Sequence, residues 1–455
     1  MKISRRLWLR LSLSLAAFCG PFSAPPARAQ GSPSRPAVIL ISIDGLKPEY
    51  VLDADAHSLK IPALRRFLRE GTYSTGVHGV VPTVTYPSHT TLLTGTSPAA
   101  RGILANNTFD PLGKNFGGWY WYAEDIKVPT LWDAAADAGL ITANVHWPVS
   151  VSARITWNLP QYWRAGTSDD RKLFRVLATP GLPDALEKDL GPYADGIDES
   201  IPGDENRAKF AARLIEWKSL VFTTIYLTAL DHEQHSSGPF SPESIATLER
   251  IDAALGAIFD SVQRTYSGRA VVCVVSDHGF ARTDKALHLG IAFRKAGLIE
   301  LDDKDHVKSW KSMIWGHGGS ATIVLHDAND AATKSQVAAL LGKLAADTRN
   351  GIDRIIGADE LHARGGFPAD QFLVALRPGF VTGDHVSGDL VTPSDSKGAH
   401  GYWPDAPEMN SSFFIAGPGI PAGRSLDEVD MRAIAPTLAQ ILKLRPPTAE
   451  AKPLL

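Results

Sequence analysis

The chain has 455 residues, of which 44% are hydrophobic and 21% charged, so it can bury a large core and is neither a disordered tail nor a disulfide-rich miniprotein. Five of its 46 basic residues lie in positions 1–29; the rest carries 41 basic and 49 acidic residues, a balance that argues against coating nucleic acid or a polybasic membrane anchor. Cysteine occurs only at Cys19 and Cys273, so any chemistry must come from histidines, carboxylates and hydroxyls.

Residues 1–29 have the organisation of a secretory signal peptide. They combine a basic start, an apolar stretch from Leu11 to Phe18 and a small-x-small pattern at Ala27 to Ala29. Residues 4–10 (SRRLWLR) also resemble a twin-arginine signal, and the route of export stays open. No later apolar run approaches the roughly 18 residues that span a bilayer. We therefore expect an exported protein, periplasmic or secreted, with no membrane anchor in its mature form.

Short apolar runs predict strands that are buried on both faces. They occupy residues 37–43, 141–145, 221–227, 271–275 and 412–416. Helical patterns lie between them, and the clearest begins at Ser241, a predicted N-cap, and Pro242, with apolar residues three and four apart up to Val262. This alternation predicts an α/β fold with a mostly parallel central sheet and helices on both faces.

The pattern changes between about residues 290 and 390. Strands are expected at 321–325 and 372–376, around a helix from about 331 to 345. We interpret this region as a smaller cap, inserted into a catalytic domain of residues 30–455 and packed over the edge of the sheet.

Metal-type ligands follow three of the predicted strands. Asp44 follows the first run, Asp231 and His235 follow the run at 221–227, and Asp277 and His278 follow the run at 271–275. A single aspartate after a strand is commonly a turn residue or a helix cap. In open α/β sheets, however, ligands bind outside the carboxyl ends of the strands, and three such positions on one rim favour a metal centre. Imidazole nitrogens and carboxylate oxygens suit Zn²⁺ and, less well, Mn²⁺ or Fe.

The segment 81–95 (VPTVTYPSHTTLLTG) predicts a short helix that starts just after Thr85. Pro87 fits its first turn and Gly95 fits its end. The Thr85 hydroxyl would face the positive end of the helix dipole, where an anionic phosphate is also favoured. Alternatively, Thr85 could serve only as the N-cap of this helix. The metal-type ligands at the strand ends of the same chain favour a role as a nucleophile instead.

Together these residues resemble the nucleotide pyrophosphatase/phosphodiesterase family of the alkaline phosphatase superfamily. Six motifs occur in the family's order along the mature chain: Asp44, and the segments 82–89 (PTVTYPSH), 102–106 (GILAN), 231–239 (DHEQHSSGP), 276–279 (SDHG) and 398–402 (GAHGY). Ser88, Arg101 and residues 232–234 depart from the family's usual pattern, which puts the substrate preference in doubt but not the chemistry.

The resemblance implies an alkaline-phosphatase-like core and a hydrolase that cleaves phosphodiester or pyrophosphate bonds of nucleotides to nucleoside monophosphates. Thr85 would form a phosphothreonine intermediate, and Asn106 would hold a phosphoryl oxygen. The implied cofactors are two Zn²⁺ per chain, with the following ligands: Asp231, His235 and His400 for one ion, and Asp44, Asp277, His278 and the Thr85 oxygen for the other.

The third ligand of the first ion has two candidates. His400 and His317 both lie between glycines, which would let the backbone bend toward a metal. His400 is favoured because it precedes the strand at 412–416 and matches the family's motif.

The substrate is the least determined feature. Tyr86 and Tyr226 resemble family positions that form an aromatic slot for a nucleobase, and Tyr162 is a looser match. Packing under the cap is the alternative for these rings. The partner would be a nucleotide or another small phosphodiester, whereas a phosphate monoester, a phosphonate or a lipid diester remain alternative substrates. A non-catalytic zinc-binding or nucleotide-binding protein is the rival of another class.

Overall fold

The computed structural model describes residues 35–115, 118–162, 169–194, 198–367, 372–445 and 448–455, which belong to one compact unit, 35–455. The predicted signal peptide lies outside these residues. Within the described ranges, no helix has both the length and the apolar character needed to cross a bilayer.

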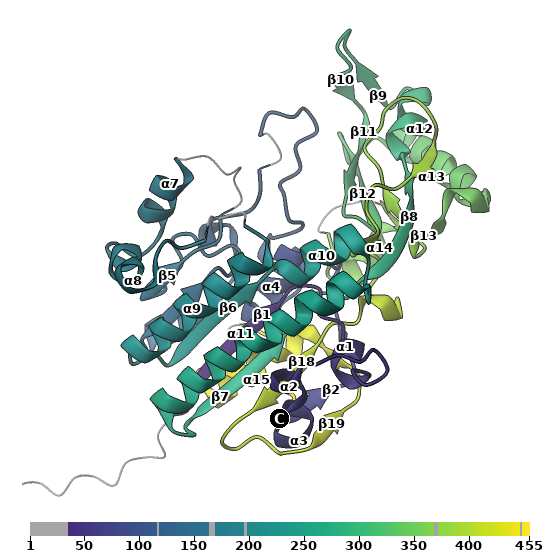
Figure 1. Ribbon diagram of the computed structural model, residues 1–455. Coiled ribbons are helices and arrows are strands. Elements are labelled where there is room, and N and C mark those ends of the chain that lie inside the picture. Colours follow the sequence, from purple (N-terminus) through teal and green to yellow (C-terminus); the bar gives the residue numbers. More distant parts are fainter. Residues whose placement is uncertain (1–34, 116–117, 163–168, 195–197, 368–371, 446–447) are drawn as a thin grey trace, which may run out of the picture. The chain divides into compact units, whose positions relative to one another are not determined.

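A central sheet forms the core of the molecule (Figure 1). Among the described residues it has eight strands, in the order β19-β2-β18-β7-β1-β6-β4-β5. Their bounds are β1 Ala37–Ile43, β2 Thr72–Ser74, β4 Thr142–Val145, β5 Trp157–Leu159, β6 Phe222–Leu227, β7 Ala270–Val275, β18 Phe413–Ala416 and β19 Arg424–Leu426. The run from β7 to β5 is parallel, and β18 pairs antiparallel with β7 and β2. The predicted strands and the mostly parallel sheet are confirmed.

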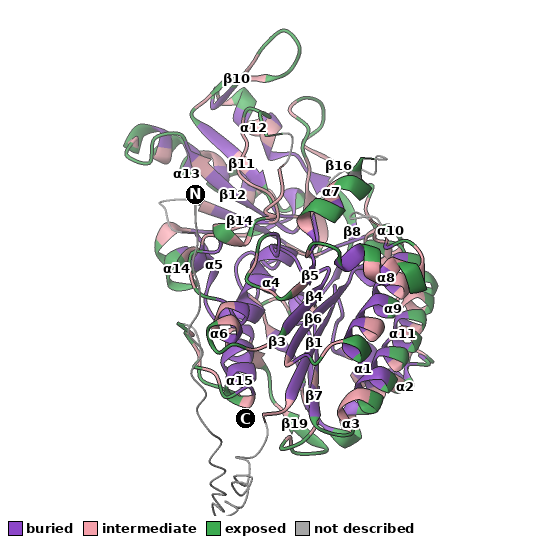
Figure 2. Ribbon diagram, turned by 90° about the vertical axis from the view of Figure 1, so that its left-hand side faces the viewer, coloured by how far each residue is buried: buried purple, intermediate pink, exposed green. Residues whose placement is uncertain are grey.

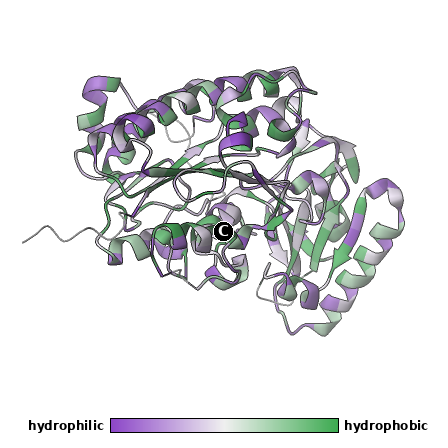
Figure 3. Ribbon diagram, turned by 90° about the horizontal axis from the view of Figure 1, so that it is seen from below, coloured by the Kyte–Doolittle hydropathy of each residue, from purple (hydrophilic) through white to green (hydrophobic). Residues whose placement is uncertain are grey.

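Alternate residues of β1 enter two separate cores, because successive side chains of a strand point to opposite faces. Ile39, Ile41 and Ile43 pack in one core, and Val38 and Leu40 pack in the other. Figures 2 and 3 show the sheet between two layers of helices.

Each helix is assigned to a layer by the core into which its buried residues pack. The first layer contains α1 Glu49–Leu52, α2 Pro62–Arg65, α3 Phe67–Glu70, α8 Leu182–Leu190, α9 Ile201–Trp217 and α11 Pro242–Tyr266. The second contains α4 Thr85–Thr94, α6 Leu131–Asp137 and α15 Ile434–Ile441. Further short helices are α5 Pro98–Arg101, α7 Asp170–Leu177 and α10 Ala229–Ser237. The sequence prediction of helices on both faces is therefore confirmed.

The predicted start of α11 is also confirmed. The Ser241 hydroxyl accepts a hydrogen bond from the Ser244 amide at 3.1 Å, and Pro242 occupies the first turn. This bond satisfies one of the amides that a helix start leaves without an intrahelical partner.

A second sheet lies within the region 290–390. Its described strands form an antiparallel sheet in the order β11-β12-β14-β13, with bounds Ser312–Gly316, Ser320–Leu325, Phe372–Leu376 and Ile352–Ile356. Helix α13 (Ala331–Ala346) packs Val337, Leu341 and Leu344 against this sheet, in a core that also includes Ala281 and Met409. The strands and the helix expected here are confirmed, whereas the division into catalytic domain and cap stays a prediction.

Smaller elements join this region to the rest of the chain. They are β8 Ala281–Leu287, α12 Leu289–Lys295, the β9–β10 hairpin Ile299–Leu301 and Val307–Trp310, α14 Ala358–Ala363, β15 Gly379–Thr382, β16 Val391–Pro393 and β17 Gly398–Ala399. Strands β3 Val77–His78 and β20 Val429–Asp430 form a separate parallel pair. Strand β8 follows β7 in the chain and pairs with β15, β16 and β17, so residues 398–399 lie beside the segment that follows β7.

Candidate active site

The carboxyl ends of three neighbouring strands place the predicted ligands together. Strand β1 lies between β6 and β7, with Ser42 in register with both Tyr226 and Val275. Asp44 follows β1, α10 follows β6, and Asp277 follows β7. The three chain segments therefore leave the sheet side by side, as expected for the ligand-binding edge of an α/β sheet.

A pocket of about 190 Å³ opens at this edge. Its lining combines most of the predicted site residues with others: Asp44, Thr85, Tyr86, Asn106, Trp119, Gln161, Glu199, Tyr226, Asp231, His232, His235 and His400. Asp277 and His278 lie beneath it and are fully buried.

One group of potential ligands is built around His278. Its Nε2 atom lies 3.3 Å from Asp44 Oδ1 and 3.2 Å from Asp277 Oδ2. The Thr85 hydroxyl is 3.4 Å from the same nitrogen. The structure thus brings together the four residues that the sequence assigned to one ion.

The other group is built around Asp231. His235 Nε2 lies 3.4 Å from its Oδ2, and His400 Nε2 lies 3.8 Å from its Oδ1. The His278 and His400 rings stack with centroids 3.7 Å apart, so the two groups adjoin. Ligand atoms of Asp231, His278 and His400 lie within 4.8 Å of one another, which puts His278 in reach of both groups. The sequence assigned it to only one.

Each of the three histidines is oriented by a backbone carbonyl. Nδ1 of His235 faces Gly398 O at 3.0 Å, Nδ1 of His278 faces Gly279 O at 3.1 Å, and Nδ1 of His400 faces Thr83 O at 3.3 Å. A carbonyl only accepts, so Nδ1 must carry the hydrogen. The Nε2 lone pairs are then left for a metal ion, which is the usual arrangement of histidine ligands.

Burial and the repulsion between neighbouring negative charges raise the pKa values of carboxyl groups in this site. Burial, and then the charges of Asp277 and Asp231, raise the pKa of Asp44 well above its usual range. Burial, and then Glu199, raises the pKa of Asp231. In the described part of the chain, Asp44 Oδ1, Asp231 Oδ1 and Asp277 Oδ2 are buried without a hydrogen-bond partner. Unpaired buried carboxylates are costly unless a cation offsets their charge, so this donor set fits divalent metal ions.

The predicted nucleophile begins helix α4. Val84, the N-cap, makes no side-chain capping bond, and Gly95 closes the helix in the left-handed conformation with φ of 70°. Asn106 Oδ1 accepts a hydrogen bond from the Tyr86 amide at 2.8 Å, which leaves its NH₂ group free to donate. Thr85 and Asn106 therefore meet in the pocket beside the two ligand groups.

The three predicted substrate tyrosines are each at most 2% exposed. The Tyr86 hydroxyl donates to Gln161 at 2.9 Å, and the Tyr226 hydroxyl donates to Asp44 Oδ2. Tyr162 lines a different pocket, with Phe174 and Tyr193 among its neighbours. The structure thus brings Tyr86 and Tyr226, but not Tyr162, to the metal-type ligands.

Several lining residues carried no signal in the sequence. Glu199 precedes α9, and its carboxylate lies 3.3 Å from His232 Nδ1. Trp119 packs edge-on to Tyr86, with ring centroids 5.2 Å apart. Only the position of His232, next to Asp231 on α10, could have suggested its place at the pocket.

The His317 side chain joins neither ligand group, although its backbone lies against Gly401. Its Nε2 is 2.9 Å from the Thr322 hydroxyl, and its ring stacks on Phe367 with centroids 5.6 Å apart. Burial lowers its pKa to about 3. It is a buried histidine of the second sheet.

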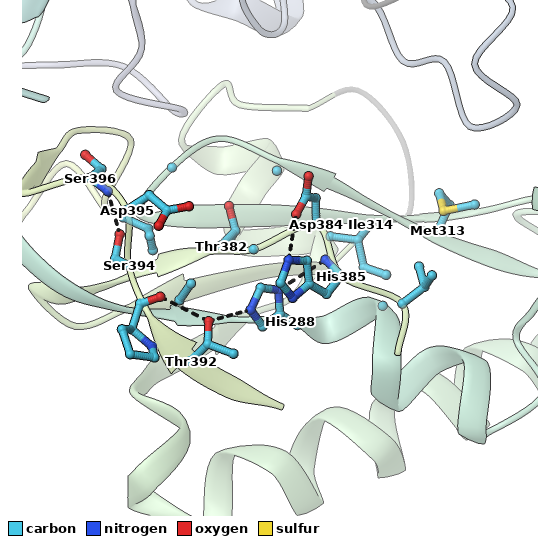
Figure 4. Close-up of a pocket in the computed structure, with 18 of the residues that line it drawn as sticks. His288, Met313, Ile314, Thr382, Asp384, His385, Thr392, Ser394, Asp395 and Ser396 are labelled. Carbon is cyan, nitrogen blue, oxygen red and sulfur yellow. Dashed lines mark hydrogen bonds and ion pairs between the residues drawn. The ribbon is translucent and has the colours of Figure 1, made fainter. Parts of the chain in front are cut away.

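A further group, His288, Asp384 and His385, lies in a larger pocket of about 640 Å³ (Figure 4). The His288 and His385 rings are parallel within 2° with centroids 4.1 Å apart. His288 also accepts from the His385 amide and faces the Thr392 hydroxyl at 2.9 Å. Both of its nitrogens are engaged, so this pocket fits a metal ion poorly.

Comparison with known proteins finds a matching family and similar relatives. The family model for type I phosphodiesterase / nucleotide pyrophosphatase matches residues 38–403. Ectonucleotide pyrophosphatase/phosphodiesterase family member 3 of Rattus norvegicus is 27% identical over 266 residues, 55% of this chain but 25% of the relative. The bis(5'-adenosyl)-triphosphatase ENPP4 of Pongo abelii is 21% identical over 420 residues, covering 90% of this chain and 79% of the relative.

A solved structure with a similar fold is that of murine ectonucleotide pyrophosphatase / phosphodiesterase 5, as an inactive threonine-to-alanine variant in complex with AMP. It has a TM-score of 0.65 and 19% identity, and the match covers 90% of this chain and 96% of that one. The chain thus has this fold, while it spans about a quarter of the first relative's length.

Proposed function

Because the chain belongs to the type I phosphodiesterase / nucleotide pyrophosphatase family, we propose that it is a metal-dependent hydrolase of phosphodiester or pyrophosphate bonds in nucleotides. The products would be nucleoside monophosphates. The observation that carries the proposal is the meeting of a helix-terminal hydroxyl, Thr85, with a double set of metal-type ligands that has unpaired buried carboxylate oxygens.

The proposed cofactors are two Zn²⁺. Asp231, His235 and His400 would hold one, and Asp44, Asp277, His278 and the Thr85 oxygen would hold the other. When bound, the ions would lower the pKa of the Thr85 hydroxyl and offset the negative charge of the leaving oxygen.

The side chains of the pocket would carry the reaction. Thr85 Oγ1 would form a bond to phosphorus as the bond to the leaving oxygen breaks, with the hydroxyl proton passing to solvent. The leaving group would depart with the electron pair. Asn106 and the amino end of α4 would stabilise the charge on a phosphoryl oxygen. Water would then attack the phosphothreonine, and the Thr85 oxygen would regain a proton as it leaves.

The test compares wild type, Thr85→Ala and Thr85→Ser with a nitrophenyl nucleotide diester, with zinc content measured on the same samples. Thr85→Ala should lower kcat by about 10³-fold or more with one or both zinc ions retained, because the attacking oxygen is lost. Thr85→Ser should keep part of the activity.

Equal turnover by wild type and Thr85→Ala would remove Thr85 from the mechanism. A wild-type protein that holds zinc without turnover would favour a binding protein. Side-by-side kcat/KM values for a monoester and a diester separate the proposal from a phosphatase of the same superfamily.

Two further proposals concern other parts of the chain. Residues of about 290–390 are proposed to form a cap on the catalytic domain, and the separate core of the second sheet supports this division.

Residues 1–29 are proposed to direct export, to the periplasm or the medium. Detection of a mature amino terminus at Gln30 in exported protein would test the proposed export.

A further inference from the structure

A buried ion pair on helix α9 contacts the start of α10. Asp204 Oδ1 and Arg207 Nη1 are 2.9 Å apart, and both side chains are fully shielded from solvent. Replacing a buried ion pair with apolar residues is often neutral or stabilising, so stability alone does not explain such a pair. Its other contacts are therefore informative.

Both carboxylate oxygens of Asp204 hold the start of α10. Oδ1 accepts from the Thr228 amide at 3.0 Å, and Oδ2 accepts from the Ala229 amide at 2.8 Å. Thr228 is the N-cap of α10 and makes no side-chain capping bond of its own. Asp204 thus supplies the cap from another helix, and its negative charge faces the positive end of the α10 dipole.

Arg207 makes two further hydrogen bonds near the start of α10. Its Nη1 donates to the Thr228 hydroxyl at 3.0 Å, and its Nη2 donates to the Asp198 carbonyl. Asp198 precedes Glu199, which pairs with His232 on α10. The guanidinium therefore links the start of α10 to the segment that contacts its next turn.

Helix α10 carries two of the proposed metal ligands close to this anchored end. Asp231 lies in its first turn, and His235 follows one turn later on the same face. A small tilt or shift at Thr228 would move both ligands together. The ligands Asp44, Asp277 and His278 follow other strands and have no link to α9 among the contacts described.

We propose that Asp204 and Arg207 are positioning residues that set the geometry of the half of the metal centre formed by Asp231 and His235. This inference rests on the proposed function, since it assumes that α10 holds a metal ion. Residues that orient metal ligands typically contribute about 10- to 100-fold to metal affinity.

The test is zinc affinity of the full chain, measured by equilibrium dialysis against a series of chelators. His400→Ala identifies which of the two zinc ions belongs to the Asp231 group. Asp204→Asn should weaken the binding of that ion by about 10- to 100-fold and affect the other ion much less. A general loss of stability would not separate the two ions in this way.

Asp252→Asn is the matched control. Asp252 is also a buried carboxylate that caps a helix from a neighbour, accepting from the Ala63 and Leu64 amides of α2 at 3.0 and 2.7 Å. Helix α2 carries no site residue. Equal weakening of zinc binding by Asp252→Asn and Asp204→Asn would overturn the proposal.

If Asp204→Asn does not fold, Thr228→Val provides the second variant, because it removes the hydroxyl that Arg207 contacts and keeps the ion pair. It should weaken the same ion by several-fold, and wild-type affinity for both ions would overturn the proposal. A wild-type chain that binds no zinc would instead contradict the proposed function.

Discussion

Tyr226 shows how one residue ties the sheet to the candidate metal centre. It lies in β6, its hydroxyl donates to Asp44 Oδ2, and its ring packs edge-on against His89 with centroids 4.4 Å apart. The hydrogen bond opposes the rise that burial causes in the pKa of Asp44. The base-stacking role stays a prediction, and the contacts also support a role in orienting Asp44.

Replacing Tyr226 by phenylalanine distinguishes these roles. Tyr226→Phe removes the hydrogen bond to a charged group, an interaction of roughly 1.5–3 kcal/mol, and keeps the ring. We expect kcat/KM to fall by at least about 10-fold, equally for a nucleotide diester and a small nitrophenyl ester. Wild-type activity in Tyr226→Phe, with a KM rise for the nucleotide alone in Tyr226→Ala, would support stacking instead.

The two glycine-flanked histidines offer a matched pair of variants. His400 lies in the pocket with Nε2 near Asp231, whereas His317 contacts Thr322 and Phe367. His400→Ala should lower zinc content and activity, because a ligand is lost. His317→Ala should lower thermal stability but retain zinc. Metal analysis of both proteins checks this, and normal zinc content in His400→Ala would refute the assignment of His400.

At the scale of elements, α4 depends on how its carboxyl end is closed. Gly95 has φ of 70°, and a Cβ there would lie 3.0 Å from both the Arg432 carbonyl oxygen and Ala449 Cβ. Gly139, just after α6, has φ of 67° and open space around it. The two positions share the left-handed conformation and differ in crowding.

Alanine at these two glycines should therefore have unequal effects. Each substitution forces a side chain into the left-handed region, at a cost of about 1–2 kcal/mol. Gly95→Ala should lose a further 1–3 kcal/mol or so from crowding. The free energy of unfolding in urea measures the difference between the two variants. Equal losses of this free energy would show that the residues near 432 and 449 move aside without an energetic cost.

At the scale of the whole molecule, the metal centre couples stability to pH. Burial raises the pKa of Asp44 and Asp231, so the metal-free folded state holds protons that the unfolded chain releases. These two carboxyl groups therefore contribute stability that is lost as the pH rises toward their raised pKa values. Burial lowers the pKa of His400 to about 3, so its ring stays neutral near pH 6, and burial also lowers the pKa of His278.

The stabilisation by zinc should consequently grow with pH. A bound cation favours the ionised carboxylates, and each proton it displaces contributes up to roughly 1.4 kcal/mol per pH unit. The rise in Tm on adding zinc should be larger at pH 8 than at pH 6 when free zinc is held constant. Calorimetry of metal-free and zinc-loaded protein tests this, and an equal rise at both pH values would contradict it.

Local patterns were sufficient for much of the fold. The apolar runs at β1, β6 and β7 identify buried strands because both faces of these strands are covered, and Ser241 and Pro242 mark the start of α11 through bonds within one turn. Asp44 and Asp277 could be placed at one edge because parallel strands end on the same side of a sheet.

Only the tertiary structure decided what meets across long stretches of sequence. It put His400 beside Asp231 and His317 beside Phe367, although both histidines have similar glycine neighbours. It also brought Glu199 to His232. The sequence alone determined the main buried strands, the start of α11 and the edge that carries the ligands, because these depend on periodicity and neighbours. Which side chains share the pocket depends on packing between distant segments, which leaves no periodic signal.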